Sequence, residues 1–328
     1  MISFKKLTTT SNRKKAGHIL QILWKIFRFF LIFGLAYIIM YPLLYMISMS
    51  FRGLVDMYDS SVTWIPKHFT LEHITRVMKA IHYPQALMVT VFISIVTSVI
   101  LVIISSMTAY GLSRHKFRGR EIIFVMVLFT IIVPQQFFVL TTFLNLKFFD
   151  IFGILKLGSL IVGENLSISL VDSPLAFFIP AIFGIGIRSG LYIYIFRQSF
   201  KGMPKELEEA AAIDGCGVFE TFVKIVVPTA VPAFVTTFLF SFVWHWNDYQ
   251  FSSIFLTNAK TLSAYLVNIT GYVYELTMDV GSVYVVDTTK SILDIQSGCL
   301  VVIIPVLILY IFLQKFFTES IERTGLVE

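Results

Sequence analysis

The chain has 328 residues, of which 56% are hydrophobic and only 14% charged, and its formal net charge is +6. This composition excludes a soluble single-core protein and predicts a polytopic membrane protein. The basic residues cluster beside apolar segments, which argues against a nucleic-acid partner. Because Cys216 falls in a polar loop and Cys299 in an apolar segment, we expect no disulfide and no cysteine metal site.

The chain begins with a basic segment, residues 1–28, that contains no acidic residue, and an uncharged run follows at 29–49. Roughly 20 apolar residues cross a bilayer, so we predict a cytoplasmic N-terminal arm and then the first transmembrane helix. The run is too long for the apolar region of a signal peptide. The loop at 52–85 should be external. In it Thr70 can cap a helix lying on the membrane or on the external rim, with an apolar stripe of Leu71, Ile74, Val77 and Ile81.

Five further apolar segments are long enough to span a membrane. The second span is followed by four basic residues within 114–120 and no acid, which predicts a cytoplasmic loop. The loops at 145–173 and 257–296 carry no basic excess and are expected outside, so both termini are expected inside. The remaining spans are predicted at 87–110, 122–144, 175–196, 231–256 and 297–317; residues 29–317 then form the transmembrane part, and residues 318–328 form a cytoplasmic tail.

A polar stretch at 203–228 separates the fourth and fifth predicted spans. Pro204 suits a first helical turn, and the acidic residues that follow favour a helix N-terminus. The run to Ile213 has high helix propensity, whereas Asp214 and Gly215 should break the helix before a second short helix. We therefore predict a cytoplasmic helix-turn-helix that lies outside the membrane.

The same stretch carries a spaced motif. Ala210 and Ala211 give the first helix a face of small residues, which on a soluble loop favours close approach by a partner. Glu209, Ala210 and Ala211 are followed after three residues by Gly215, and after nine more residues by Ile225 and then Pro228. This pattern resembles the EAA loop of permease subunits of bacterial ABC importers, with a single departure, Val227 in place of Leu. In that family the loop is the coupling helix, which docks on the ATP-hydrolysing subunit. The residues that the resemblance assigns to coupling are Glu209, Ala210, Ala211, Asp214, Gly215 and Pro228; an ordinary interfacial helix pair is the alternative.

Two other segments, the loop at 109–120 and the tail at 315–328, are similar to those of MalG-like sugar permeases. The resemblance implies an all-α protein of six transmembrane helices in the bacterial cytoplasmic membrane. It also implies three partners: a second, MalF-like permease, a dimer of ATP-binding subunits, and an extracytoplasmic solute-binding protein. This chain has no Walker motif of its own, so ATP and Mg would be bound by the ATPase subunit.

Candidate residues for a polar path lie in the fourth and fifth spans. A charge at a helix centre costs roughly 2.5–3.5 kcal/mol on insertion scales, so Arg188 should face a cavity or a partner, either lining the path or bonding backbone carbonyls. The outer end of the fifth span holds Trp244, Trp246, Asn247, Asp248 and Tyr249. This cluster is either an interfacial aromatic belt or a platform on which sugar rings stack. A direct pair of Arg188 with Asp248 is not expected, because their depths along the spans differ.

The third span also contains polar residues that could either pack or line the path. They lie beside Pro134, which should kink this span near mid-membrane. Gln135 and Gln136 follow this proline and could either pack around the kink or line the path. The six histidines are scattered, and we find no spacing typical of a catalytic or metal site. The sequence therefore predicts a permease for a sugar or oligosaccharide rather than an enzyme. The alternatives are a permease for another polar solute, such as an amino acid or polyamine, and a six-span membrane enzyme or sensor.

Overall fold

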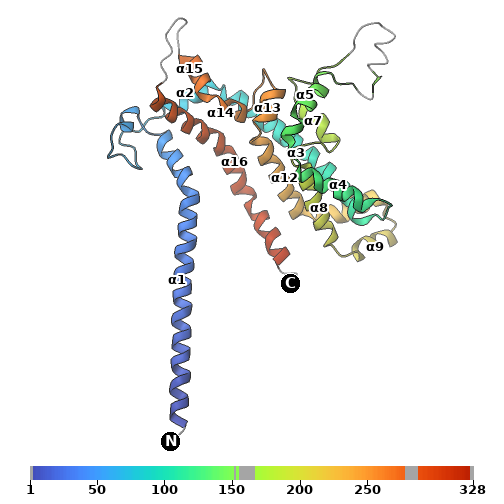
Figure 1. The fold of residues 1–328 in the computed structure, drawn as a ribbon. Coiled ribbons are helices and arrows are strands. Elements are labelled where there is room, and N and C mark those ends of the chain that lie inside the picture. Colours follow the sequence, from blue (N-terminus) through green and yellow to red (C-terminus); the bar gives the residue numbers. More distant parts are fainter. Residues whose placement is uncertain (1–2, 151–152, 155–166, 278–286, 326–328) are drawn as a thin grey trace. The chain divides into compact units, whose positions relative to one another are not determined.

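The computed structural model describes residues 3–150, 153–154, 167–277 and 287–325, and Figure 1 shows its fold. Over these residues the regular structure is helical, apart from two isolated β-bridges. The predicted all-α class is confirmed. The chain divides into two compact units, Met1–Thr75 with Val285–Leu300 and Arg76–Tyr284 with Val301–Glu328.

The first unit begins with α1 (Ser3–Ser50), one uninterrupted helix, drawn in blue in Figure 1. Its apolar part, Leu20–Ser50, has 31 residues and contains the predicted first span. At 1.5 Å per residue this part is about 46 Å long, which exceeds the roughly 30 Å of a bilayer core. The N-terminal arm is therefore helical from Ser3 and continuous with the span.

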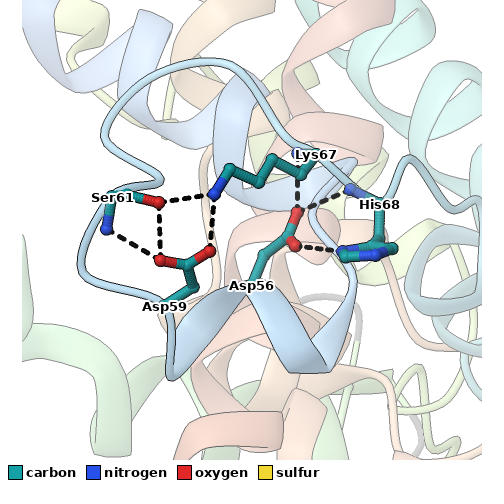
Figure 2. A network of polar contacts seen from close by, with 5 residues as sticks. All are labelled: Asp56, Asp59, Ser61, Lys67 and His68. Atoms are coloured by element: carbon teal, nitrogen blue, oxygen red, sulfur yellow. Dashed lines mark hydrogen bonds and ion pairs between the residues drawn. The ribbon is translucent and has the colours of Figure 1, made fainter.

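After α1, the chain folds back on itself through the short 3₁₀ helix η1 (Leu54–Met57). The buried carboxylate of Asp56 accepts hydrogen bonds from the backbone N–H groups of Lys67 at 2.9 Å and His68 at 2.8 Å (Figure 2). Asp59 makes a second set of contacts, with Ser61 and with Lys67 Nζ, the latter at 2.7 Å (Figure 2). Burial by itself would raise the pKa of Asp56, but the hydrogen bonds from His68 and Lys67 outweigh it and lower that pKa.

The predicted helix after Thr70 is α2 (Glu72–Ala80), and Thr70 Oγ1 accepts a hydrogen bond from the Glu72 N–H at 3.1 Å. The cap is thus confirmed. Of its apolar stripe, Val77 and Ile81 are buried in a core with Trp246 and Leu262, whereas Leu71 is exposed. This half of the stripe therefore packs against protein within the second unit.

In the second unit, the central element is α3 (Tyr83–Arg114), which packs against α7, α8 and α12. The face of α3 that makes these contacts carries small polar side chains, all buried: Ser94, Thr97, Ser98, Ser105 and Ser106. Small side chains let helices approach closely, so this face of α3 suits close helix packing.

The other elements of the second unit follow in chain order. They are α4 (Arg120–Ile132), η2 (Gln135–Phe138), α5 (Val139–Lys147), α7 (Leu175–Ile182), α8 (Ser189–Lys201), α9 (Glu206–Ile213), α10 (Val218–Thr221), η3 (Phe222–Val226), α11 (Val227–Thr229), α12 (Val231–Trp246), α13 (Gln250–Phe255), α14 (Leu262–Val267) and α15 (Ile269–Thr277). The last helix, α16 (Thr288–Gly325), begins in the first unit and ends in the second, so the predicted tail at 318–328 is helical as far as Gly325.

Among the described residues, three helices are long and apolar enough to cross a membrane, and counting two sharply bent helix pairs as spans gives up to five. The third predicted span is one bent pair, with a turn of 95° beside Pro134, as the proline suggested. The fourth, 175–196, is not one helix: α7 and α8 are separated by residues 183–188. The count of six spans therefore remains a prediction.

Two other boundaries also differ from the prediction. The fifth span was expected to run to residue 256, but α12 ends at Trp246 and α13 begins at Gln250. The loops predicted at 145–173 and 257–296 lie partly outside the described residues. Cys216 and Cys299 are free.

Candidate functional site

The stretch at 203–228 forms the expected helix-turn-helix. Helix α9 carries Glu206, Glu208 and Glu209 in its first turn, where the helix dipole favours negative charge. It ends in a Schellman motif, in which the Gly215 N–H donates to the Ala212 carbonyl at 3.1 Å and the Cys216 N–H to the Ala211 carbonyl at 2.9 Å. Gly215 has φ 86°, a left-handed conformation that glycine adopts without steric cost.

The two alanines of the motif do not share one face. Ala211 is buried against the rest of the second unit, whereas Glu209, Ala210 and Asp214 are exposed. Ala211 therefore packs inside the protein, whereas Ala210 lies on the outer surface of the loop. The predicted face of two alanines is wrong in this respect, because neighbouring residues on a helix point about 100° apart.

Large apolar side chains are exposed around the same turn. Ile213 is 86% exposed and Phe219 is 68% exposed, and Val218 beside it is also exposed. Together with Glu209 and Asp214 they form what we call the loop surface. Large apolar side chains exposed on a polar loop favour contact with another molecule.

The second half of the stretch is anchored to a hydrophobic core. Phe222 and Val226 are buried among Tyr110, Phe196 and Phe200. Residues 222–226 form a π-helical turn, and Pro228 follows in the short helix α11, where a proline near the helix start needs no N–H partner. The chain then bends by 82° between Thr229 and Val231 into α12.

An ion pair fixes the first half. Arg114, in the last turn of α3, has its Nε 2.8 Å from Glu208 Oε1, and these side chains are 6% and 20% exposed. Arg114 Nη2 also donates to the Met203 carbonyl at 2.8 Å, and the Tyr110 hydroxyl reaches Glu208 Oε2 at 3.4 Å. Sequence reasoning missed this pair: it used the basic cluster at 114–120 only to assign topology.

A second arginine lies close to the same end of α3. Arg197 of α8 is buried and donates to the Leu112 carbonyl at 3.3 Å and to Glu121 Oε2 at 2.9 Å. Its guanidinium also stacks over the Phe124 ring at 3.6 Å. Arg197 therefore joins α8 to the ends of α3 and α4.

Arg188 differs most from its expected position. It is not inside a helix: it precedes α8 with φ 61°, at the break between α7 and α8. Its guanidinium lies 4.8 Å from the centre of the Trp244 ring, which is a cation–π contact. The structure thus brings together one residue of the fourth predicted span and one of the fifth.

The remaining members of the aromatic cluster have structural contacts. Trp246 is 1% exposed and donates its indole N–H to the Val302 carbonyl at 3.2 Å. Asp248 accepts from the Phe251 and Ser252 N–H groups, each at 3.1 Å, and so caps α13. The Asn247 side chain donates to the Val243 carbonyl at 3.0 Å, while Tyr249 is exposed.

Sequence reasoning also missed a cavity of about 390 Å³ in the second unit. It lies where two helix breaks meet, because Gln135 Nε2 beside the α4–η2 break donates to the Gly186 carbonyl in the α7–α8 break at 2.9 Å. Its wall is mostly aromatic and aliphatic, with polar groups from Thr97, Thr130, Gln135, Thr142, Ser189 and His245. Pro134 and the glycines at 184 and 186 mark the two breaks in the sequence, but their meeting at one cavity depends on tertiary packing.

Residues 101–323 match the protein family described as "Binding-protein-dependent transport system inner membrane component", and this stretch is more than half of the chain. The chain belongs to this family. The match includes the whole helix-turn-helix at 203–228, so the resemblance to importer permeases is confirmed.

Curated relatives of the permease align over nearly their full length. The permease is 28% identical over 301 residues to the polygalacturonan/rhamnogalacturonan transport system permease protein YtcP of Bacillus subtilis (strain 168). This alignment covers 90% of this chain and 94% of YtcP. The permease is 26% identical over 295 residues to the arabinooligosaccharides transport system permease protein AraQ of Halalkalibacterium halodurans, covering 89% and 92%.

A solved structure supports the fold. A chain of a bacterial ABC transporter involved in the import of the acidic polysaccharide alginate matches the permease with a TM-score of 0.59. The match covers 93% of the permease and 98% of that chain, at 22% sequence identity. At this identity the likeness concerns the fold alone.

Proposed function

We propose that this permease forms half of the translocation path for a sugar or oligosaccharide and couples transport to ATP hydrolysis on a separate subunit. Family membership supports the role in import. The names of the aligned relatives, which refer to polygalacturonan, rhamnogalacturonan and arabinooligosaccharides, support carbohydrate as the solute. The chain is then a transport subunit rather than an enzyme.

The proposal includes a complete set of partners. A second permease would form the other half of the path, two ATP-binding subunits would hold ATP and Mg, and a solute-binding protein would deliver the sugar. The assembly would lie in the bacterial inner membrane, with both termini of this chain cytoplasmic.

The observation that carries the coupling proposal is the loop surface. Ile213 and Phe219 expose large apolar side chains on a helix-turn-helix that is otherwise anchored by its buried side, and Glu209 and Asp214 border them. An apolar groove with a basic rim on the ATPase subunit would complement this surface in both shape and charge.

Co-purification of the ATPase with the tagged permease tests the coupling surface. Ile213→Asp and Phe219→Asp should each release the ATPase while the permease still inserts, because a buried carboxylate in an apolar groove is unfavourable. Val267→Asp, at an exposed apolar position of α14, is the matched control. Retention of the ATPase by both loop variants would refute the assignment.

For the path we propose Arg188 with Trp244. Arg188 lies between Ile187 and Ser189 in the chain, and both of these neighbours line the cavity. The five N–H donors of a guanidinium suit sugar hydroxyls or carboxylates.

Uptake of radiolabelled galacturonate or arabinose oligosaccharides tests the path. Arg188→Ala should lower uptake by about tenfold or more, the loss expected when one charged hydrogen bond of roughly 1.5–3 kcal/mol is removed. The complex should remain assembled. If the complex is lost instead, Arg188 is a structural residue and does not line the path.

A further inference from the structure

Glu208 and Glu209 are adjacent on α9 but lie in opposite environments. Glu209 is exposed on the loop surface, whereas Glu208 points back to the permease and pairs with Arg114. The same carboxylate is also within 3.4 Å of the Tyr110 hydroxyl. The EAA pattern assigns a role to Glu209 and none to Glu208.

A helix of eight residues such as α9 is too short to be stable alone, so its position depends on the contacts it makes. The apolar contacts at Ala211 and Phe222 hold it in place but are non-directional. The ion pair adds an electrostatic contact between two largely buried side chains, with Arg114 Nε 2.8 Å from Glu208 Oε1. Arg114 Nη2 also donates a directional hydrogen bond to the Met203 carbonyl, just before α9, at 2.8 Å.

The C-terminal end of α3, which carries Arg114, is also held by other contacts. Arg197 holds the Leu112 carbonyl, two residues before Arg114, and bonds Glu121 at the start of α4. The end of α3 is therefore fixed to α4 and α8. Those helices reach the cavity, which is lined by Thr97 of α3 and Ser189 of α8.

We propose that the Arg114–Glu208 pair is a transmission brace. It fixes α9 to the end of α3, so that a displacement of α9 by the ATPase moves α3 and the wall of the cavity with it. Glu208 and Arg114 are positioning residues, and Glu209 belongs to the docking surface. This inference rests on the proposed function, because it presupposes that the loop surface contacts the ATPase.

The test uses the complete transporter, purified with its partner subunits and reconstituted into proteoliposomes with the binding protein. The quantity measured is the number of ATP molecules hydrolysed per oligosaccharide transported, with galacturonate and arabinose oligosaccharides as probes. Glu208→Gln keeps the shape of the side chain and removes its charge. It should raise this ratio at least about fivefold, the lower limit of usual coupling between sites, and the yield of assembled complex should be unchanged.

Three further variants make the experiment specific. Glu206→Gln removes an exposed charge from the same turn and should leave the ratio unchanged. Arg114→Gln should match Glu208→Gln, and the double variant should be no worse than either, because both changes break one interaction. Arg114→Lys keeps the charge but cannot bond both Glu208 and Met203, so its ratio should be intermediate.

A normal ratio in Glu208→Gln, additive effects in the double variant, or loss of assembled complex without a change in ratio would each overturn the brace. Ile213→Asp separates this failure from that of the proposed function. If Ile213→Asp releases the ATPase while Glu208→Gln transports with a normal ratio, only the brace is wrong. If Ile213→Asp leaves the ATPase bound, the docking surface is wrong as well.

Discussion

Gly215 gives the most direct test of the helix-turn-helix geometry. Its φ of 86° ends α9 and starts the turn toward α10, and a Cβ built at this position meets no atom within 4 Å. Steric space is therefore not the reason for glycine within this chain. The left-handed backbone conformation is the reason. Replacing Gly215 by alanine causes no clash and changes only the free energy of adopting that conformation.

The magnitude follows from the left-handed conformation. An L-residue other than Asn or Asp loses roughly 1–2 kcal/mol there, and a β-branched residue loses more. A free-energy difference of that size changes the ratio of the populations of two conformational states about 5- to 30-fold. Gly215→Ala should therefore reduce uptake by about that factor, Gly215→Val should reduce it further, and Gly215→Asn should remain close to wild type because Asn tolerates this region.

The assay is uptake by cells that express the whole transporter, with the amount of membrane-inserted permease measured in parallel. Gly202→Ala serves as the control, since Gly202 has φ −76° and its Cβ would make only ordinary contacts. Full uptake by Gly215→Ala would refute the conformational argument. Loss of uptake by Gly215→Asn equal to that of Gly215→Val would show that a partner approaches the glycine closely.

The other predictions concern packing, topology and pH. Gly190→Ala should destabilise the permease by about 1–3 kcal/mol, measured as a lower Tm in detergent, because the new Cβ would lie 2.9 Å from the Val127 carbonyl oxygen. A cysteine at Arg118, in a background without Cys216 and Cys299, should resist impermeant reagents in intact cells; external labelling would refute the topology. Because hydrogen bonds lower the pKa of Asp56, its stabilising effect is present above the ordinary Asp range and lost as pH falls through about 4 and below. The protection of the Lys67 and His68 amides against hydrogen exchange, corrected for the intrinsic pH dependence of exchange, should fall in that window, and Asp56→Asn should abolish this pH dependence.

The sequence was most informative where local chemistry decides the structure. The ends of α9 follow from Pro204, the acidic first turn and Gly215, and the bend of 95° follows from Pro134. Uninterrupted apolar runs predicted α3 correctly to within a few residues at each end. These features need no knowledge of the rest of the chain.

The helix breaks in the fourth and fifth predicted spans could not be predicted from the local sequence in the same way. Residues 183–188 are apolar enough to continue a helix, and their break depends on Gly184, with φ 74°, and on Gly186 against Leu101. The Arg114–Glu208 pair joins residues that are 94 positions apart, and the charge pattern is equally compatible with other pairings. Both features depend on tertiary packing, which a single sequence does not specify.

The breaks also change which polar residues can belong to the solute path. Backbone groups freed by a break inside a membrane must be satisfied by the protein. Gln135 Nε2 does this for the Gly186 carbonyl, and the Asp248 carboxylate does it for the N–H groups of Phe251 and Ser252 in α13, so these atoms are already hydrogen-bonded.

Arg188 and Thr97 are in a different situation. The ring of Trp244 takes up none of the five N–H donors of Arg188, and Thr97 Oγ1 has no hydrogen-bond partner within the described part of the chain. A path for a polar solute needs groups that are free to exchange partners, whereas groups that complete a broken backbone must keep theirs. Under the proposed function, the guanidinium of Arg188 is therefore a better candidate for the path than the carboxylate of Asp248, which accepts hydrogen bonds from the N–H groups of Phe251 and Ser252.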